Sequence, residues 1–412
     1  MNIVYVNHYA GSEIHGIEYR PFFLAREWVK MGHEVTILCA SYTHLRKINP
    51  TVTKNFTEEI IEGIRYVWVN TPSYKDNSVF RTLNIFSFLK KLKKNAQWLA
   101  DTYKPHLVIA SSTYPMDAYP CRTIADLAGG VMIFEIHDLW PLTQMTFGNL
   151  SKKNPVVRYL QKAEDFAFTR SDGIVSILPH ADKHIRERNV HNFFFLFVPN
   201  GVIIEQDSGE NSKIPEPHQT LLRELKAQNR FILMYLGGHT VSNSLETLVE
   251  SGQWMPSNVS VVFVGEGRYK ARLQEACAQK RYKNFHFLPG VPKSCVRALQ
   301  AEADFLYIGA KKCKLYEYGV GMNKYYDYML SARPIINGVE ASNNLVKEAN
   351  CGVTIPAEDP KALAEAVAEA AKLSAEERNR LGQNGYAYVT AHHEYRALAE
   401  KFLDFEPIKK GM

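Results

Sequence analysis

The sequence predicts an α/β protein of two domains, each built on a parallel sheet that helices cover. Short, almost wholly apolar runs alternate with helical patterns along the 412 residues, as expected for parallel strands buried on both faces. One polar stretch, 203–229, interrupts this alternation before the pattern restarts. It holds two prolines and a Ser-Gly-Glu-Asn-Ser run, so we predict a linker there. The length also favours two hydrophobic cores over one.

The first predicted domain covers residues 1–202. It starts with a strand at 2–7 and a helix at 17–31, which Gly32 ends. The turn PNGV at 199–202 closes the domain. Further strands are expected at 34–39, 64–69, 106–111, 131–136, 173–178 and 193–198. Ligands of such sheets bind at the carboxyl ends of the strands, so the loops that follow these strands are candidates for the site.

The second predicted domain covers residues 230–385 and repeats this architecture. Two strands, at 231–238 and 259–267, each run into a glycine turn, and Ser374 is expected to cap a late helix. The segment 386–412 follows with an aromatic helical pattern. The other expected elements are strands at 284–290, 303–309, 333–338 and 351–356 and helices at 243–251 and 361–373. Two such domains leave a cleft between them, where ligands prefer to bind.

The composition excludes several classes of protein. No apolar run approaches the roughly 20 residues that span a bilayer, and the N-terminus lacks the features of a secretory signal, so we expect a cytoplasmic protein. The six cysteines form no CxxC pair and no zinc spacing, which favours reduced thiols. The net charge of +6 is too mild to choose among nucleic acid, anionic lipid and phosphorylated ligands. Basic residues gather at 81–94 without aromatic platforms, which disfavours nucleic acid.

The most informative segment is GVGMNKYYDYMLSARPII at 319–336. Its glycines free the backbone, Asn323 is expected to cap a helix, and the helical pattern begins at Lys324. A helix N-terminus of this kind attracts anions, usually phosphate, and the lysine adds a full charge. Asp327 follows one turn later, where it can accept hydrogen bonds from sugar hydroxyls. A nucleotide-sugar is the simplest ligand with both groups. The candidate donor-binding residues here are Gly319, Gly321, Asn323, Lys324 and Asp327.

Five motifs follow one another along the chain. They are HYAGS…GIEYRPFFLAREWVKMGHEVTIL near the N-terminus, EIHDLWP at 135–141, PNGV at 199–202, FVGEG at 263–267 and GMNKYYDYMLSARPII near the C-terminus. In this order they resemble the family 4-type glycosyltransferases of the GT-B fold, in the branch that builds bacterial surface polysaccharides. The resemblance covers nearly the whole chain. It implies two Rossmann-like domains facing across a cleft, a last helix that crosses back to the N-terminal domain, and sugar transfer from a nucleotide donor, usually with retention.

In the N-terminal half, the resemblance points to two groups of residues. It places the loop HYAGS, with Gly11 and then Gly16, near the donor phosphates; the loop does not match GxGxxG, which argues against a dinucleotide site. It places His137 near the transferred sugar, where it hydrogen-bonds a hydroxyl or steadies developing charge. Asp138 then orients that histidine or contacts the acceptor. The alternative is a strand-end cluster that caps neighbouring backbone, and we favour function for His137 more than for Glu135.

In the C-terminal half, the glycine turns containing Gly238 and Gly265 suit close approach by a phosphate or a base. Many members of the resembled family carry an Arg and a Lys after the first turn, but here that place is HTVSNSLE. We therefore expect the diphosphate to be bound by Lys324, by Arg268 or by backbone N–H groups. The segment LPGVP, with Val291, resembles the family segment whose backbone contacts the nucleobase.

The resembled family often has two glutamates separated by seven residues. Asp327 stands at the position of the second glutamate, which usually binds the ribose. The position of the first glutamate is occupied by Gly319. Glu317 lies two residues early and is our candidate for the missing catalytic carboxylate; alternatively, the loop backbone replaces that contact. The chain contains no Asp-x-Asp, so we expect a metal-independent enzyme without cofactors. The leaving diphosphate would be stabilised by the helix N-terminus and Lys324.

Residues 81–99 form a basic amphipathic candidate for contact with an anionic membrane. Leu83, Phe86 and Leu89 are expected to share one face, with lysines crowding the rest. Such a helix would hold the enzyme on the inner face of the cytoplasmic membrane, beside a lipid-linked acceptor. The alternative is a helix packed on the sheet with a solvated basic face.

The leading functional prediction is a retaining hexosyl- or N-acetylaminosugar transferase of O-antigen, capsule or exopolysaccharide assembly. Its expected partners are a UDP- or GDP-sugar donor and a lipid-linked or oligosaccharide acceptor. One alternative is a nucleotide-sugar 2-epimerase of the same architecture, which would convert donor without acceptor. The other is a non-catalytic partner protein that binds a sugar nucleotide.

Overall fold

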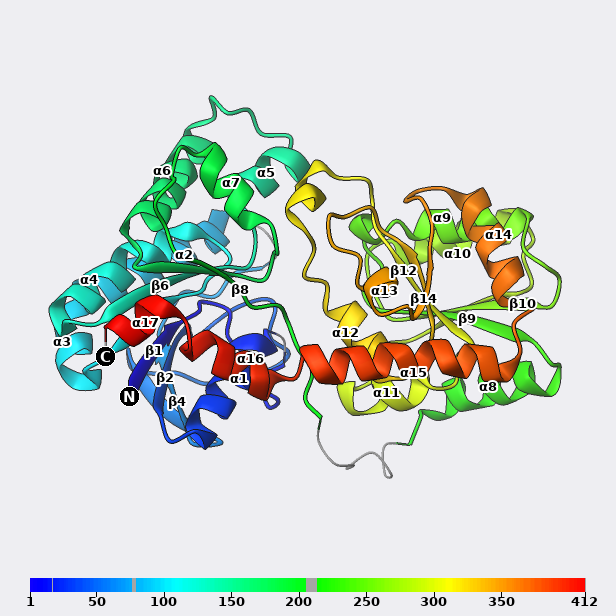
Figure 1. Ribbon diagram of the computed structural model, residues 1–412, viewed down its shortest axis with the longest axis horizontal. Helices are drawn as coiled ribbons and strands as arrows, with labels where there is room; N and C mark the ends of the chain where they lie inside the picture. The colour runs from blue at the N-terminus through cyan, green and yellow to red at the C-terminus, as the bar shows by residue number, and fades with distance from the viewer. Residues whose placement is uncertain (17, 76–78, 205–212, 412) are drawn as a thin grey trace. The chain divides into compact units, whose positions relative to one another are not determined.

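The computed structural model describes residues 1–16, 18–75, 79–204 and 213–411. Two compact units each contain one sheet with helices on both faces (Figure 1). Unit 1 consists of Met1–Asn200, Glu317–Gly321 and the residues from Tyr395 onward, and unit 2 consists of Gly201–Tyr316 and Met322–Glu394. The predicted class, α/β with two parallel-sheet domains, is confirmed.

The sheet of unit 1 has the order β3-β4-β2-β1-β5-β6-β7-β8. All neighbours are parallel except β3 and β4, which form an antiparallel hairpin at the edge. The sequence analysis missed β3, because TEEII is short and mostly polar, as an edge strand can be. The strands are β1 (Asn2–Val6), β2 (Glu34–Ala40), β3 (Thr57–Ile61), β4 (Ile64–Val69), β5 (Leu107–Ala110), β6 (Val131–Ile136), β7 (Gly173–Ser176) and β8 (Phe195–Phe197).

Helices cover the two faces of this sheet because alternate side chains of its strands point to opposite sides. Tyr5 faces α1, where it contacts Trp28, and Trp28 in turn packs on Phe402 of α16. Val4 and Val6 face the other side, in the core that includes α2, α3, α4 and α6. The helices of unit 1 are α1 (Tyr19–Lys30), α2 (Val79–Lys94), α3 (Ala96–Tyr103), α4 (Ala118–Ala128), α5 (Leu142–Phe147), α6 (Pro155–Arg170), α7 (Ala181–Glu187), α16 (Tyr395–Leu403) and α17 (Glu406–Lys410).

The sheet of unit 2 is wholly parallel, in the order β11-β10-β9-β12-β13-β14. Its strands are β9 (Phe231–Leu236), β10 (Val259–Val264), β11 (Phe285–Leu288), β12 (Phe305–Gly309), β13 (Ile335–Gly338) and β14 (Gly352–Thr354). Its helices are α8 (Glu216–Ala227), α9 (Leu245–Glu250), α10 (Lys270–Gln279), α11 (Lys293–Gln300), α12 (Asn323–Leu330), α13 (Leu345–Glu348), α14 (Pro360–Ala370) and α15 (Ala375–His392). Ser374 caps α15 in a capping box, as predicted.

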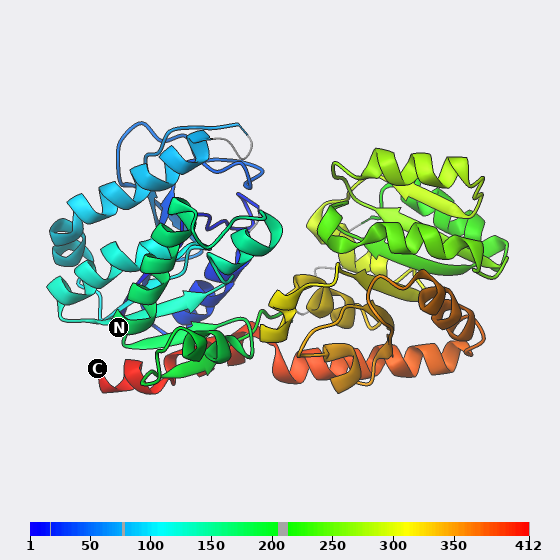
Figure 2. The same ribbon diagram turned by 90° about the horizontal axis from the view of Figure 1, so that it is seen from above.

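The limits of the units differ from the predicted domain boundaries in three places. Of the predicted linker 203–229, residues 205–212 lie outside the described part, and Glu216–Ala227 forms α8. The segment Glu317–Gly321 belongs to unit 1. The return to unit 1 begins at Tyr395 instead of 386, since α15 continues to His392 within unit 2. The returning helices α16 and α17, in red, lie against unit 1 in both views (Figures 1 and 2).

Helix α2 does not have the single apolar face that we predicted. Ile85, Phe88, Leu89 and Leu92 are buried in the core of unit 1. Leu83 and its apolar neighbours remain exposed on the outer side, at fractions from 43% to 77%: Val79, Phe80, Leu83 and Phe86. The apolar residues are thus divided between packing on the sheet and facing solvent. No helix in the described ranges has the length and apolarity to cross a bilayer.

Candidate active site

The polar centre of unit 1 lies where the strand order of the sheet reverses direction. The order runs outward from β1 in one direction and from β5 in the other, so the loops after these two strands diverge and leave a crevice. Asn7 and Ser111 stand at the carboxyl ends of β1 and β5, and the Asn7 amide donates to the Ser111 carbonyl at 2.7 Å. Glu135 and His137 end the adjacent strand, β6.

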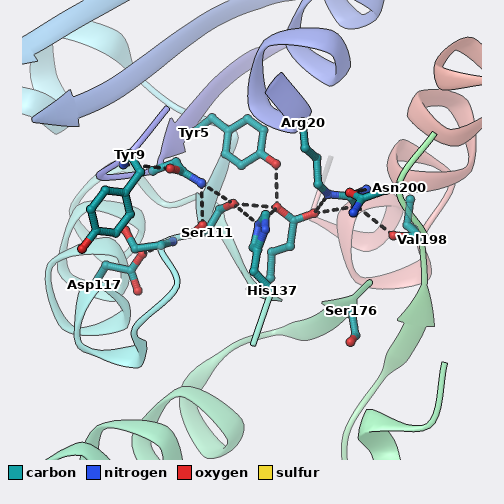
Figure 3. A network of polar contacts seen from close by, with 12 residues as sticks. Tyr5, Tyr9, Arg20, Ser111, Asp117, His137, Ser176, Val198 and Asn200 are labelled. Atoms are coloured by element: carbon teal, nitrogen blue, oxygen red, sulfur yellow. Dashed lines mark hydrogen bonds and ion pairs between the residues drawn. The ribbon is translucent and has the colours of Figure 1, made fainter. Parts of the chain in front are cut away.

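Glu135 is completely buried and is the hub of a polar network (Figure 3). Its Oε1 accepts from Nε and Nη2 of Arg20 at 3.0 and 2.8 Å. Its Oε2 accepts from the Tyr5 hydroxyl at 2.5 Å and the Ser111 hydroxyl at 2.7 Å. The same oxygen lies 3.1 Å from Nε2 of His137. Both carboxylate oxygens are therefore occupied by donors from separate elements.

Charge in this network is strongly biased. Burial alone would raise the pKa of Glu135, but Arg20 and His137 outweigh it and hold that pKa well below its usual range. Burial, and then the charge of Glu135, raise the pKa of Tyr5 well above its ordinary value. The carboxylate is therefore a fixed negative charge and cannot act as a general acid.

The network also determines which nitrogen His137 presents. Nε2 lies 2.8 Å from the Ser111 hydroxyl, whose proton is directed to Glu135. We therefore assign the proton of the neutral ring to Nε2, which donates to the hydroxyl and carboxylate oxygens. Nδ1 makes no hydrogen bond within the described residues and keeps contact with solvent. It is free to accept from a sugar hydroxyl or, on a protonated ring, to donate.

Asp138 has the contacts of a structural cap. Its carboxylate accepts from the backbone N–H of Leu139 at 2.9 Å, from Thr143 Oγ1 at 2.5 Å and from Trp140 Nε1 at 3.1 Å. These bonds fix the turn that leads into α5. Within the described residues Asp138 forms no hydrogen bond to His137. Its geometry is therefore explained by capping of the neighbouring turn, the alternative to orienting His137. A contact with the acceptor stays a prediction.

Sequence reasoning missed several members of this centre. Arg20 lies inside the GIEYRPFF motif. The signal that could have found it is a basic residue in the first turn of a helix, together with a single acid in an otherwise apolar strand. Asp117 was also missed. It is fully buried, accepts from the backbone N–H of Ser112 at 2.7 Å, and burial raises its pKa to about 7.

The predicted phosphate loop of unit 1 is held by the protein itself. The Gly11 carbonyl accepts from the Tyr66 hydroxyl at 2.7 Å, and its N–H donates to Glu18. Gly16 has a φ of 74°, in the left-handed region where glycine is favoured, and its N–H closes a turn on Ser12. The positive φ explains Gly16 by loop shape, whereas the bonds of Gly11 are ones that the backbone of any residue could make. Ligand contact at this loop stays a prediction.

The second polar centre lies in unit 2, at the carboxyl end of β9. The side chain of Lys324 packs against Gly237. A Cβ added to Gly237 would lie only 2.6 Å from Cε of Lys324. The Nζ atom lies 5.3 Å from the centre of the Tyr235 ring and 3.3 Å from Oδ1 of Asn243. Our prediction that Asn323 caps the helix is wrong: Met322 is the N-cap, and Asn323 is already helical.

The two glycine turns of unit 2 pack on each other backbone to backbone. The N–H of Gly237 donates to Val264 at 3.0 Å, and that of His239 donates to Glu266 at 2.8 Å. An added Cβ at Gly265 would lie 2.1 Å from the Gly237 carbonyl oxygen. At Gly238 it would meet Thr240 Cγ2 at 3.7 Å, an ordinary contact, so this position has room for a methyl group.

Two family models match the chain. The model described as Glycosyltransferase Family 4 matches residues 14–206, and the model described as Glycosyl transferases group 1 matches residues 226–388. The first region contains Arg20, Glu135 and His137, and the second contains Lys324; Tyr5 and Asn7 precede the first match. The chain belongs to the family 4-type glycosyltransferases.

Solved structures of low sequence identity share the GT-B fold of this glycosyltransferase. HepE of Anabaena, solved with UDP and glucose, superposes with a TM-score of 0.67, at 11% identity and 98% coverage of both chains. Sucrose-phosphate synthase of Thermosynechococcus elongatus gives 0.72, at 14% identity, covering 97% of this chain and 96% of its own. WaaG, a glycosyltransferase involved in lipopolysaccharide biosynthesis, gives 0.66, at 14% identity and 98% of both chains. No curated protein sequence matches.

The other predicted donor residues of the glycosyltransferase differ in their surroundings. Asp327 is half-exposed and lies 3.8 Å from Nζ of Lys293, a weak pair that a ribose hydroxyl can displace. Arg268 is exposed and Val291 is partly buried. In the described residues, no group of three His, Cys, Asp or Glu side chains could hold a metal ion.

The catalytic candidate Glu317 and two glycines of the predicted donor segment belong to unit 1. Glu317 is exposed, at the end of a short 3₁₀ helix, Lys314–Tyr318. Gly319 has a φ of 101°, and the Gly321 carbonyl accepts from the Asn200 amide at 2.9 Å. The boundary between the units therefore falls inside the predicted segment, just before Lys324.

Lys270 is a residue of the glycosyltransferase that sequence reasoning missed. Its Nζ bonds the carbonyls of Gly265 at 3.0 Å and Leu288 at 3.1 Å, and Glu266 at 2.9 Å. It therefore ties the second glycine turn to the segment that contains Val291. No sequence signal marked it, because a lysine in the first turn of α10 is an ordinary surface residue.

Substitutions at Gly265 and Gly238 together test whether the donor binds at these turns. Gly265→Ala is expected to destabilise the protein, because its Cβ would overlap the Gly237 carbonyl and its φ of 141° strains an L-residue. Gly238→Ala should keep the melting temperature and weaken UDP binding about tenfold, because the added methyl group would occupy room at this turn. Thermal melts with and without UDP measure both effects. Unchanged UDP affinity in folded Gly238→Ala would place the donor elsewhere.

Proposed function

We propose that this glycosyltransferase moves a hexosyl or N-acetylaminosugar group, with retention, from a UDP- or GDP-sugar to a lipid-linked or saccharide acceptor. The observation that carries the donor half is Lys324, held over Tyr235 at the turn that contains Gly237 and Gly238. HepE was solved with UDP and glucose, and WaaG acts in lipopolysaccharide biosynthesis. These relatives support a nucleotide-sugar donor and a place in O-antigen, capsule or exopolysaccharide assembly.

The proposed donor contacts follow from charge. Lys324 is largely buried without a carboxylate within 4 Å among the described residues, and burial lowers its pKa to about 8, although Asp327 raises it. A diphosphate beside Nζ would supply the missing negative charge. The first N–H groups of α12 add donors at the same place. Asp327 would accept from the ribose hydroxyls after releasing Lys293.

The proposed transfer breaks the bond between the anomeric carbon and the diphosphate oxygen. The acceptor oxygen bonds that carbon on the same face, and the acceptor's proton passes to the departing phosphate oxygen. No protein nucleophile is required. Nδ1 of His137 would hold a hydroxyl of the sugar, and Lys324 would stabilise charge on the leaving diphosphate. We propose that the reaction needs neither metal nor cofactor.

The direct test incubates the purified enzyme with UDP- and GDP-sugars, with and without an acceptor. NMR of the product should show the anomeric configuration of the donor, and EDTA should leave the rate unchanged. Inversion, or dependence on a divalent ion, would contradict the proposed chemistry. Conversion of donor without acceptor would favour the 2-epimerase. A thermal-shift screen of UDP-, GDP- and ADP-sugars identifies the base, because a ligand that binds only folded protein raises its melting temperature.

The Lys324 pKa predicts how donor affinity depends on pH. In the free enzyme its charge is present below about pH 8 and is lost above it. UDP-sugar affinity should therefore fall as pH rises from 8 to 9.5, measured by calorimetry. Unfolding does not explain this fall, because a lysine pKa lowered by folding makes the folded state gain stability as pH rises through the same range.

The matched variants for this pH profile are Lys324→Arg and Lys324→Ala. Arginine stays charged, so its profile should be flat across this range. Alanine should bind the donor weakly at every pH. A wild-type slope that persists in Lys324→Arg would assign the titration to another group.

We also propose that the enzyme is cytoplasmic and lies on the inner face of the membrane through α2. Its exposed Phe80 and Leu83 would enter the interface, and its exposed lysines would face anionic headgroups. Lys91 is left unchanged in the test below, because its Nζ donates a hydrogen bond to the Asn70 carbonyl. Replacing Lys90, Lys93 and Lys94 by Gln should reduce binding to anionic liposomes and spare transfer to a soluble acceptor. Equal liposome binding would reject this orientation.

A further inference from the structure

A cavity of about 480 Å³ in unit 1 lies apart from the Glu135 network. Helices α5, α6 and α7, which lie together in Figure 1, form its walls, and Tyr318 from the 3₁₀ helix completes it. This volume is in the range of small-molecule sites. Nothing in the transfer chemistry proposed above uses these residues.

The cavity carries an excess of positive charge. Lys152, Arg158 and Lys162 line it, and within the described residues none of the three has a carboxylate within 4 Å. A fourth cation, Arg188, is neutralised by Asp165, which it meets through Nε and Nη2, both at 3.0 Å. Three positive charges that converge on one cavity without partners attract an anion of more than one charge.

The acidic groups around the cavity are already engaged. The buried Glu164 accepts from Gln161 at 2.6 Å and pairs with His184 at 2.9 Å. Glu187, the single carboxylate among the described lining residues, accepts from the Tyr318 hydroxyl at 2.7 Å. These bonds hold Glu187 of α7 against Tyr318 and join Glu164 of α6 to His184 of α7. The side formed by Arg158 and Lys162 of α6 is left for an anion.

The same cavity has an apolar part, and the helices around it expose further apolar side chains. Leu142, Met145 and Val157 line the cavity itself. On the outer surface of α6, Tyr159 is 42% exposed, and its ring lies 5.9 Å from that of Phe86 on α2. The exposed apolar side chains on α5, α6 and α2 that could form a path are Phe147, Val156, Tyr159, Phe86, Leu83 and Phe80. Such a path suits an apolar chain and does not suit a free saccharide.

We propose that this cavity binds the phosphate or diphosphate of an amphiphile, and that the amphiphile's apolar chain follows the exposed residues of α6 and α2. Arg158 and Lys162 contact the phosphate oxygens, with Lys152 beside them. The inference rests on the proposed function, because the amphiphile is then the lipid-linked acceptor. It narrows the acceptor to molecules that join a phosphate group to a hydrocarbon chain.

The test uses three soluble probes: geranyl diphosphate, inorganic diphosphate and geraniol. Calorimetry at constant ionic strength is run with UDP present in excess, so that the nucleotide site is filled. Geranyl diphosphate should bind at least fivefold more tightly than inorganic diphosphate, and geraniol should not bind. Equal affinity for geranyl diphosphate and inorganic diphosphate would show that the cavity binds free phosphate groups, and would overturn the proposal that its ligand is an amphiphile. If none of the three probes binds, the proposal that this cavity is a ligand site is overturned.

The variant Arg158→Glu/Lys162→Glu should weaken geranyl diphosphate binding at least tenfold. The matched control is Lys54→Glu/Lys104→Glu, which makes the same change of charge at exposed positions on other elements of unit 1. An equal loss in the control would reveal a general charge effect and reject the site. The milder pair Arg158→Gln/Lys162→Gln repeats the measurement should charge reversal impair folding.

The two proposals fail in distinguishable ways. UDP binding and transfer to a soluble saccharide acceptor are measured on the same proteins. If these activities are present and geranyl diphosphate does not bind, the cavity proposal falls and the transferase proposal stands. If geranyl diphosphate binds as expected but no sugar is transferred from any donor, the cavity binds an amphiphile that is not an acceptor, and the inference as stated fails.

Discussion

Replacing Arg20 by methionine is expected to lower the free energy of unfolding by about 3–5 kcal/mol, the usual cost of removing one partner of a buried ion pair. The change leaves the carboxylate of Glu135 without its principal counter-charge in a fully buried place. It also frees the carbonyls of Val198 and Pro199, to which the guanidinium donates. Denaturant unfolding followed by circular dichroism measures the loss.

The second variant separates the ion pair from packing. Arg20→Met combined with Glu135→Gln removes both charges, so it should recover part of the stability lost in the single variant. The Tyr5 and Ser111 hydroxyls can still donate to the amide oxygen. A double variant no more stable than Arg20→Met would show that lost packing, and not an uncompensated charge, dominates. The recovery is therefore the decisive comparison.

His137→Ala is expected to lower kcat roughly 100-fold to 10,000-fold, the range over which a side chain that handles protons or developing charge acts. The ring is 8% exposed and is held by Ser111 and Glu135, so its loss removes a positioned group and leaves the sheet intact. The KM for the donor should change little, because in our proposal Lys324, and not His137, binds the diphosphate. Steady-state kinetics with a soluble acceptor give both constants.

The control for this prediction is Ser111→Ala. It removes the hydroxyl bridge and keeps the ring in contact with Glu135, so kcat should fall by a smaller factor than in His137→Ala. Melting temperatures of both variants must stay near that of the wild type for the comparison to hold. Product formation by His137→Ala equal to that of the wild type would end the catalytic assignment of His137, whereas a wild-type protein that forms no product from any donor would favour the non-catalytic partner.

Several features of the glycosyltransferase could be predicted from residue order alone. Apolar runs ending in glycine turns predicted β9 and β10, because a buried parallel strand needs apolar side chains on both faces. Periodicity placed both ends of α1 within two residues and both ends of α14 within three residues of those observed. Lys324 was recognised beside a helix start, where local chemistry points to an anion. Each of these predictions depends on residues that are close in the sequence.

Other features could not be predicted, because the sequence contains more than one way to satisfy the same pattern. The apolar residues of α2 are numerous enough for two faces, and only packing on the sheet shows that Phe88 is inside and Leu83 outside. Asn323 has the preference of a cap, but the turn before the helix places Met322 there. The β3 hairpin is polar because it lies at an edge.

The sequence by itself determined the two parallel sheets, the glycine turns at their strand ends and a lysine in the first turn of a helix, since spacing and side-chain type suffice for these. Tertiary structure alone decided that Arg20 neutralises Glu135 across 115 residues, and that the cations of α6 face a cavity beside Tyr318. The physical reason is that the free energy of a charge depends on burial and on distances to its partners. Packing sets both after distant segments have met.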